Sequence, residues 1–232
     1  AEKSFYGCSR LKELTLGSNL TSALNNFVPT TVNKIKVSYG GSDIPNGYFY
    51  SLVCVKEVIV SSPIVTIPSK CFCSCASLKS VTLPSSLQEI QSNAFDGCVS
   101  MTDITIPSLV QKISQYCFYA CVSLKSIELP SSLIEIESYA FKNCVSLTTL
   151  TIPLNTKTVA WNSFSGCSHL IELTLGVISS SNLDYCIPNT VNRIKILNDT
   201  TSIPEGYFSD LTNVTDIILP ESVMIISSKC FY

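Results

Sequence analysis

Cysteine is the residue of this chain with the richest potential chemistry, because a thiol can bind a metal, attack a substrate or form a disulfide. The chain has twelve. Nine stand at two fixed positions relative to a phenylalanine: Cys8, Cys75, Cys98, Cys121, Cys144 and Cys167 three positions after it, and Cys71, Cys117 and Cys230 directly before it. Such columns predict inward packing, since free cysteine behaves as a small apolar residue. Disulfides between adjacent repeats are the alternative, although equivalent side chains on stacked repeats run parallel rather than toward each other.

The segment Cys71-Phe-Cys73-Ser-Cys75 is the one local cysteine cluster that resembles a metal site. Zinc is normally held by four ligands in two spaced pairs, and the nearest further cysteines, Cys117 and Cys121, belong to a repeat two positions away. We therefore expect neither a metal nor another cofactor. Cys54 and Cys73 stand in slots that are otherwise polar, so we expect them to be the most exposed thiols.

Catalysis is difficult to assemble from the remaining residues. The single histidine, His169, stands where sister repeats carry serine, which indicates an exposed turn. A nucleophile needs a base within hydrogen-bond reach, and the sequence contains no Ser-His-Asp, Cys-His or glycine-rich phosphate pattern. The carboxylates of Asp103 and Glu128 could meet across neighbouring repeats, but solvated carboxylates are the simpler interpretation. The sequence predicts a protein that is not an enzyme.

The elements that position these residues repeat with a period of 23. Phenylalanine recurs at Phe49, Phe72, Phe95, Phe118, Phe141 and Phe164, and again at Phe208 and Phe231. A fixed period of this length is typical of a solenoid, in which each repeat buries its apolar face only by stacking on its neighbours. In the repeat that starts at Leu78, Val81 and Leu83 alternate with polar residues as in a strand, and Leu87 and Ile90 return inward across the opposite wall.

Apolar residues that end a strand recur along the whole chain. They fall at Leu16, Val37, Val60, Leu83, Ile106, Leu129, Ile152, Leu175, Ile196 and Leu219. Successive members are one full period apart, except that the steps to Val37 and to Ile196 are two positions shorter. This pattern predicts ten parallel strands in register, about 4.8 Å apart. In the two shorter repeats Phe27 and Cys186 occupy the phenylalanine slot, where we expect a tighter coil or a locally bent sheet.

A longer period contains the two short repeats. Residues 1–73 superimpose on residues 160–232 without a gap, as in Ile44-Pro-Asn-Gly-Tyr-Phe against Ile203-Pro-Glu-Gly-Tyr-Phe. This match indicates duplication of a block of repeats. We interpret residues 1–232 as a single solenoid domain from a longer protein.

The repeated pattern Ala-Phe-x-x-Cys-x-Ser-Leu-x-x-Ile-x-Leu-Pro-x-Ser-Leu-x-x-Ile resembles the BspA-like, or treponemal-type, leucine-rich repeat, most closely from Phe72 to Trp161. The resemblance implies a right-handed leucine-rich-repeat solenoid of about ten coils, with a parallel β-sheet on one face and short strands, turns, or 3-10 or helical turns on the other. Members of that family are commonly surface proteins of anaerobic bacteria and parasitic protists, implicated in adhesion to host matrix proteins or to other cells.

Outward-facing positions of the predicted sheet are the better functional candidates. They place two basic pairs on either side of a threonine-rich acidic stretch, which is typical of a strip that contacts a protein or a glycan. The candidate binding residues are Lys34, Lys36, Glu57, Thr82, Asp103, Thr105, Glu128, Thr151, Glu172, Arg193 and Lys195. The alternative is that threonine suits an exposed strand and that the charges keep the sheet soluble. Specificity is expected where the period breaks, around residues 34–47 and 193–206, and Trp161 is either an exposed anchor or a packing residue.

Composition sets the outer limits of function. The formal net charge is −2, which gives no electrostatic footprint for nucleic acid. No apolar run approaches the roughly 18 to 20 residues needed to cross a bilayer. We therefore predict a binding module at the cell surface or outside the cell, which adheres to host or matrix proteins or to glycans. An intracellular scaffold for protein assembly is the alternative, because unpaired cysteines suit a reducing compartment.

Overall fold

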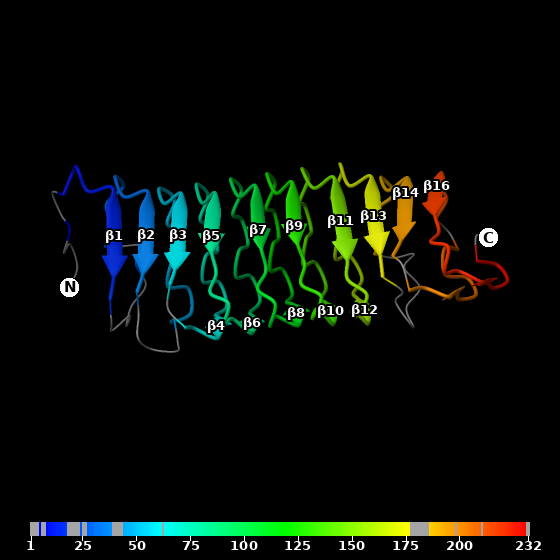
Figure 1. Cartoon of the computed structure of the whole chain (residues 1–232). Coiled ribbons are helices and arrows are strands. Elements are labelled where there is room, and N and C mark those ends of the chain that lie inside the picture. Colours follow the sequence, from blue (N-terminus) through cyan, green and yellow to red (C-terminus); the bar gives the residue numbers. More distant parts are fainter. Residues whose placement is uncertain are drawn as a thin grey trace.

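The computed structural model describes residues 5, 8–17, 24, 27–38, 44–61, 63–176, 186–197, 199–209 and 211–230. These residues form an elongated parallel β-solenoid (Figure 1) and contain no helix. Ten strands stand side by side along one face: β1 (Glu13–Leu16), β2 (Lys34–Val37), β3 (Glu57–Val60), β5 (Ser80–Thr82), β7 (Asp103–Thr105), β9 (Ser126–Glu128), β11 (Thr149–Ile152), β13 (Glu172–Leu175), β14 (Arg193–Ile196) and β16 (Asp216–Ile218). Each lies where the sequence pattern placed a strand.

The strand register of this face confirms the predicted spacing of the repeats. Glu57 pairs with Ser80 across a regular step, and Glu172 pairs with Arg193 across a shorter one, so parallel pairing holds for both kinds of coil. At the short coils, where a tighter coil or a locally bent sheet was expected, the strand pairing is continuous: β1 and β13 keep four-residue ladders with β2 and β14. Hydrogen bonding divides the face into three successive sheets of four, two and four strands.

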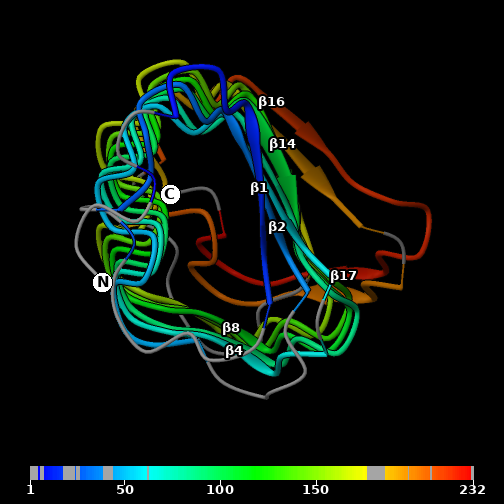
Figure 2. The same ribbon diagram turned by 90° about the vertical axis from the view of Figure 1, so that its left-hand side faces the viewer.

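A second row of two-residue strands forms another side of the coil (Figure 2). It comprises β4 (Thr66–Ile67), β6 (Glu89–Ile90), β8 (Lys112–Ile113), β10 (Glu135–Ile136), β12 (Thr158–Val159), β15 (Ser202–Ile203) and β17 (Ile225–Ile226). Ile67, Ile90, Ile113 and Ile136 are buried along this row. The proline that follows many strands of the main face, such as Pro84, has no amide hydrogen to extend the ladder, so the chain turns toward the second row there.

The third side of the coil is a stack of turns, at the left of Figure 2, which we call the turn side. Regular turns carry two left-handed residues four positions apart, such as Lys70 (φ 57°) and Ser74 (φ 61°). The alternating conformation directs every second amide at the next coil: the Phe72 nitrogen donates to the Ala94 oxygen at 2.7 Å and the Ser74 nitrogen to the Asp96 oxygen at 2.7 Å. The turn side is therefore a hydrogen-bonded ladder as regular as a sheet.

Phenylalanine fills the core behind these turns. The six rings from Phe49 to Phe164 are fully buried and stacked, with centroid separations that widen from 4.9 Å at Phe49–Phe72 to 5.6 Å at Phe141–Phe164. Strand residues such as Ile104 and Ile127 and second-row residues such as Leu87 close the core from the other two sides. The stack follows from the fixed period, because the same residue type recurs at the same place on every coil.

Candidate binding surfaces

All eleven candidate binding residues lie on the face formed by the ten strands, and their side chains alternate with the buried ones as predicted. Thr82, Asp103, Thr105, Glu128 and Thr151 are exposed in its middle, while the candidates toward its ends are exposed or half-buried. The middle of the face therefore presents the threonine-rich acidic stretch that the sequence indicated.

The ends of this face are neutralised internally. The Nζ atom of Lys34 lies 3.0 Å from Oε2 of Glu57, and that of Lys36 lies 3.8 Å from Oε2 of Glu13. At the other end Arg193 contacts Asp216 at 2.8 Å and Glu172 at 3.7 Å. The basic rungs were expected to present charge to a ligand, but most of that charge is already paired within the sheet. Lys195 is exposed and forms no ion pair with any described residue.

The middle of the face differs from its ends. Asp103 accepts a hydrogen bond from Thr102 Oγ1 at 2.8 Å, and neither Asp103 nor Glu128 forms an ion pair within the described part of the chain. The carboxylate pair considered for catalysis lies on diagonal positions of β7 and β9, both exposed to solvent. These carboxylates are therefore available to an external partner.

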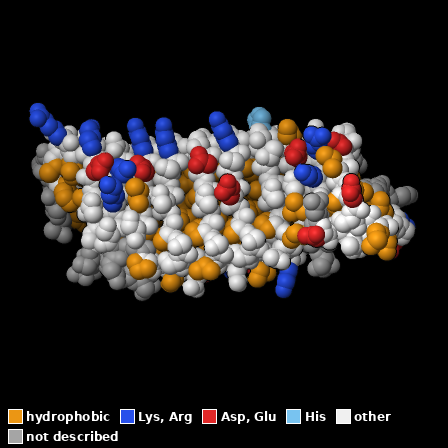
Figure 3. Space-filling view, in the orientation of Figure 1, with side chains coloured by type: hydrophobic (Ala, Val, Ile, Leu, Met, Phe, Trp, Pro, Cys, Tyr) orange, Lys and Arg blue, Asp and Glu red, His pale blue; other side chains and the backbone are white. Residues whose placement is uncertain are grey.

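A row of lysines borders the face where the strands begin, and the sequence interpretation missed it. Figure 3 shows basic side chains along this edge. Lys12, Lys56, Lys79 and Lys125 occupy the position directly before a strand, and all four are exposed. Backbone hydrogen bonds align the row: the Lys79 nitrogen donates to the Lys56 oxygen at 2.8 Å. None of the four forms an ion pair with a described residue. The signal was present as a third column with the same period, but only the two strand columns were considered for ligand contact.

The turn side carries a cavity of about 470 Å³ lined by aromatic and charged side chains. Tyr50, Cys73, Asp96 and Tyr119 line it from one column of the stack, in which each residue is one period from the next. Lys70, Asn93 and Tyr116 line it from a second column, and Lys142 lies beyond Tyr119. Of these residues the sequence analysis singled out only Cys73, as an exposed thiol, and it did not predict a cavity here.

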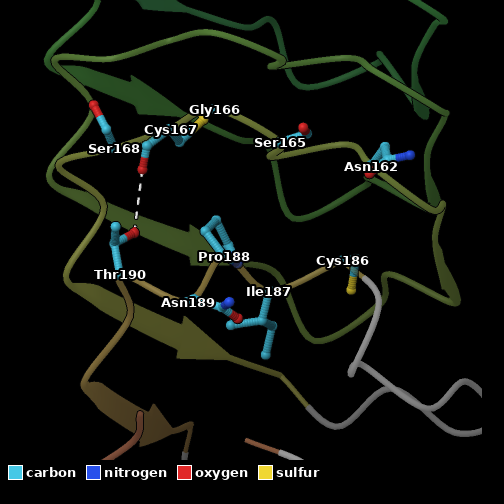
Figure 4. A pocket seen from close by; sticks show the side chains of 10 residues that line it. All are labelled: Asn162, Ser165, Gly166, Cys167, Ser168, Cys186, Ile187, Pro188, Asn189 and Thr190. Atoms are coloured by element: carbon cyan, nitrogen blue, oxygen red, sulfur yellow. Dashed lines mark hydrogen bonds between the residues drawn. The ribbon is translucent and has the colours of Figure 1, made fainter. Parts of the chain in front are cut away.

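A second cavity, of about 490 Å³, lies where the period breaks (Figure 4). It separates the turn of residues 162–168 from the shorter turn that begins at Cys186. Cys186 replaces the phenylalanine of regular coils, and Thr190 Oγ1 donates to the Cys167 oxygen at 3.2 Å across the junction. The lining of this second cavity includes Asn, Ser, Thr and Gly residues with Ile187 and Pro188. It offers hydrogen-bonding groups to a ligand but no charged group. A cavity thus marks one of the two breaks in the period. Its lining residues precede residues 193–206, the range in which specificity was expected.

The cysteine columns are structural. Cys75, Cys98, Cys121, Cys144 and Cys167 are buried, and each thiol donates to the carbonyl oxygen of the phenylalanine one coil earlier, as Cys98 does to Phe72 at 3.2 Å. Burial raises the pKa of the Cys75 thiol to about 12 and that of the Cys98 and Cys117 thiols well above the usual range. A protonated, buried thiol is a poor nucleophile and a poor metal ligand.

Two expectations about individual cysteines are wrong. Cys8 was placed inward, but it is exposed, since its coil is the first of the described stack and no earlier phenylalanine carbonyl lies beside it. Cys73 was expected among the most exposed thiols, yet it is 8% exposed, in the lining of the cavity that Tyr50 also lines. Burial raises the Cys73 pKa, against a hydrogen bond with Ser74 that lowers it. Cys54 is half-buried.

The remaining chemical candidates lie in ordinary surroundings. His169 is exposed in a turn, as predicted, and its Nδ1 atom lies 2.7 Å from the Val145 oxygen. Trp161 is 60% exposed and meets Tyr139 edge-on at 6.2 Å, so it is both exposed and in contact with a neighbouring coil. Among the described residues, no group of three potential ligands from His, Cys, Asp and Glu is arranged to hold a metal ion. The described part of the chain also includes no helix of the length and apolar character needed to cross a bilayer.

Comparison with known proteins agrees with the solenoid. The model of the BspA type leucine rich repeat region matches in six copies, over residues 1–102, 42–171 and 176–232. The chain belongs to this family. Its repeats explain the columns described above, since each slot of the repeated pattern corresponds to one side of the coil.

The same fold occurs in a solved structure of a leucine rich cell surface protein from Faecalibacterium prausnitzii. That protein is 22% identical with a TM-score of 0.67, covering 96% of this chain and 67% of that protein. Weaker similarity extends to a leucine-rich repeat protein from Bacteroides ovatus, which is 18% identical with a TM-score of 0.42; the match covers 100% of this chain and 67% of that one. The leucine-rich repeat protein of T. pallidum is 20% identical with a TM-score of 0.43; the match covers 91% of this chain and 77% of that one. No curated protein matches the sequence significantly.

Proposed function

We propose that this chain is a non-enzymatic binding module of a cell-surface protein and that it contacts a protein or glycan through the middle of its strand face. The observation that carries the proposal is the distribution of unpaired charge. Asp103 and Glu128 on the face and Lys79 and Lys125 on its edge have no ionic partner within the described residues, whereas the carboxylates toward the ends of the face are paired with basic residues: Glu13, Glu57, Glu172 and Asp216. Exposed charges of both signs give a partner electrostatic complementarity and fixed register.

The shape of the same region supports contact with a partner. Thr82, Thr105 and Thr151 present short side chains beside the charged ones, so a partner can approach the backbone closely. The parallel ladders on either side hold these positions rigid, which lowers the ordering cost of association. We therefore place the contact region in the middle coils, whereas the strip predicted from the sequence also included the flanking basic rungs.

Location at the cell surface is supported by analogy. The Faecalibacterium prausnitzii protein of the same fold is described as a cell surface protein. Repeat solenoids serve as extended binding surfaces. Adhesion of this chain to host cells or matrix is the specific form that we propose for that role.

An intracellular scaffold is the second candidate, favoured by the thiol chemistry. The twelve cysteines are thiols rather than disulfides in the structure, which suits a reducing compartment. Alkylation of the chain purified from its native host without reductant, followed by mass spectrometry, separates the two locations. Several disulfides in that material would contradict the cytosolic scaffold.

Charge reversal tests the proposed contact region. Purified wild-type chain and the double variant Asp103→Lys/Glu128→Lys are compared for binding to host cells and to immobilised matrix proteins. We expect the double variant to bind at least about tenfold more weakly. The matched control is Glu172→Lys/Asp216→Lys, which places the same charge change at the paired end rung and is expected to have the smaller effect. Equal binding by wild type and by the middle-coil variant would refute the assignment.

A further inference from the structure

The cavity on the turn side is bounded by a change of side-chain size within one column. Tyr50 and Tyr119 are three coils apart, and the two positions between them hold the shorter Cys73 and Asp96. Three coils span about 14 Å at the usual spacing of parallel strands. Large side chains at both ends and short ones between leave an open notch of about 470 Å³. This volume falls in the range of small-ligand sites.

Hydrogen-bonding groups of both kinds surround the notch. The Asn93 amide nitrogen donates to Oδ2 of Asp96 at 3.0 Å, which fixes both side chains and leaves carboxylate lone pairs available. Burial, the largest effect, raises the pKa of Asp96, while Asn93 and the ammonium of Lys70 lower it. Lys70 on one side adds an ammonium donor, and Lys142 lines the other side, where its Nζ atom lies 5.0 Å from the centroid of the Tyr139 ring. The notch can therefore donate hydrogen bonds to, and accept hydrogen bonds from, a ligand with many hydroxyl groups.

The backbone beneath the notch is preorganised. Asn93 has φ 60°, a left-handed conformation that asparagine tolerates better than most residues. The Ser74 nitrogen donates to the Asp96 oxygen at 2.7 Å and the Gly97 nitrogen to the Tyr119 oxygen at 2.8 Å, so three successive coils are tied together under the site. A ligand would meet a backbone whose conformation is already fixed, which lowers the ordering cost of binding.

The chemistry of this lining discriminates among small ligands. Quaternary ammonium compounds bind aromatic cages, but two lysines beside the notch repel a cation. A wholly apolar ligand would leave Asp96 and Asn93 without water or a new partner. A sugar ring satisfies the lining, because its hydroxyls bond to the polar groups while its C–H faces pack on tyrosine. Two ammonium groups against one carboxylate favour a sugar that carries a negative charge.

We propose that the notch between Tyr50 and Tyr119 is a saccharide-binding site and that it prefers an acidic sugar, such as a uronic or sialic acid unit of a glycan. The site lies on the turn side, a different side of the coil from the strand face assigned above. It stands independently of that assignment, since its test uses free sugars and no residue of the strand face.

Titration followed by two-dimensional NMR of the amide signals tests the site. The probes are methyl β-D-glucuronide, the α-methyl glycoside of N-acetylneuraminic acid, and methyl β-D-glucoside as the neutral counterpart. We expect an acidic probe to shift signals of residues 50, 73, 96 and 119 and to bind more tightly than the glucoside. Tyr50→Ala and Tyr119→Ala are each expected to weaken binding at least about tenfold. Lys70→Gln is expected to remove the preference for the acidic sugar.

Matched variants separate a site from a general effect. Trp161→Ala removes an exposed aromatic side chain of the same side, and Lys79→Gln removes a lysine on the strand edge; neither is expected to alter binding. Thermal unfolding of each variant identifies loss of fold. The proposal is wrong if neither acidic probe shifts these signals at millimolar concentration, if the glucoside binds as tightly as both acids, or if Trp161→Ala weakens binding as much as folded Tyr119→Ala does.

Discussion

The stacked phenylalanines allow a quantitative test of how the coils stabilise one another. Phe95 and Phe118 are fully buried, and their rings lie 5.3 Å apart, nearly parallel at 1°. Each also stacks on one further ring, Phe72 at 5.1 Å and Phe141 at 5.4 Å. Replacement by leucine keeps an apolar side chain but removes the ring, at an expected cost of about 1 to 1.5 kcal/mol from repacking. Each lost ring pair adds about 0.5 to 1.5 kcal/mol.

Counting ring pairs gives the sign of the coupling. Phe95→Leu and Phe118→Leu each break two pairs, but the double variant breaks three because one pair is shared. The double variant should therefore lose less stability than the sum of the single losses, by about 0.5 to 1.5 kcal/mol. Equilibrium urea unfolding, followed by circular dichroism at fixed m-value, measures the four corners of the cycle.

The matched control is the pair Phe72 and Phe118, which share no ring contact because one coil lies between them. This second cycle should be additive within about 0.3 to 0.5 kcal/mol. Additivity in both cycles would refute the idea that ring stacking contributes beyond burial. Coupling of equal size in both would instead indicate that the whole stack relaxes together.

Three further predictions concern the glycines and thiols. Gly176→Ala should lower the free energy of unfolding, measured from the urea midpoint, by about 1 to 3 kcal/mol, because a Cβ at this position would lie 2.6 Å from the Leu154 nitrogen. The control is Gly17→Ala, at the equivalent position after β1, which should leave the midpoint unchanged because no atom lies within 4 Å of its Cβ. Native-state alkylation should label Cys8 rapidly and leave Cys98 and Cys121 unlabelled, since only Cys8 of these is exposed; equal rates would contradict the packing described. The free energy of unfolding should fall above about pH 8.5, because thiols of the unfolded chain ionise there while burial holds the pKa of Cys75 in the folded chain near 12. The expected loss is about 1.4 kcal/mol per pH unit for each such thiol. Unfolding midpoints measured from neutral to alkaline pH should show a smaller decline in Cys75→Ala, and an unchanged slope in that variant would refute the assignment to Cys75.

Much of the fold was predictable because a solenoid converts sequence period directly into spatial position. Val81, Ile104 and Ile127 were expected inward and are buried, and Glu128 and Thr151 were expected outward and are exposed. Cys73 departs from this correspondence between sequence period and position. Its slot carries polar residues in sister coils, but the Cys73 side chain lies in the lining of the notch and is only 8% exposed, which no count along the chain could reveal.

The binding surfaces divide in the same way. The outward columns of the strand face were identified from alternation alone, because alternate side chains of a strand point to opposite faces. Pairing of Arg193 with both Glu172 and Asp216 depends on three coils at once and became visible only in the structure. The notch between Tyr50 and Tyr119 likewise depends on side chains three coils apart, whose sizes matter only when their coils are stacked.

The sequence by itself determined the family, the period, the parallel register and the inward or outward direction of most side chains, because each of these recurs once per coil and needs only one coil to define it. The tertiary structure decided which charges are neutralised, which thiols reach solvent and where the surface is hollow. Those properties belong to pairs and triplets of neighbouring coils. They depend on how side chains of unlike size and charge meet across the stack, at distances that the order of residues along one coil does not specify.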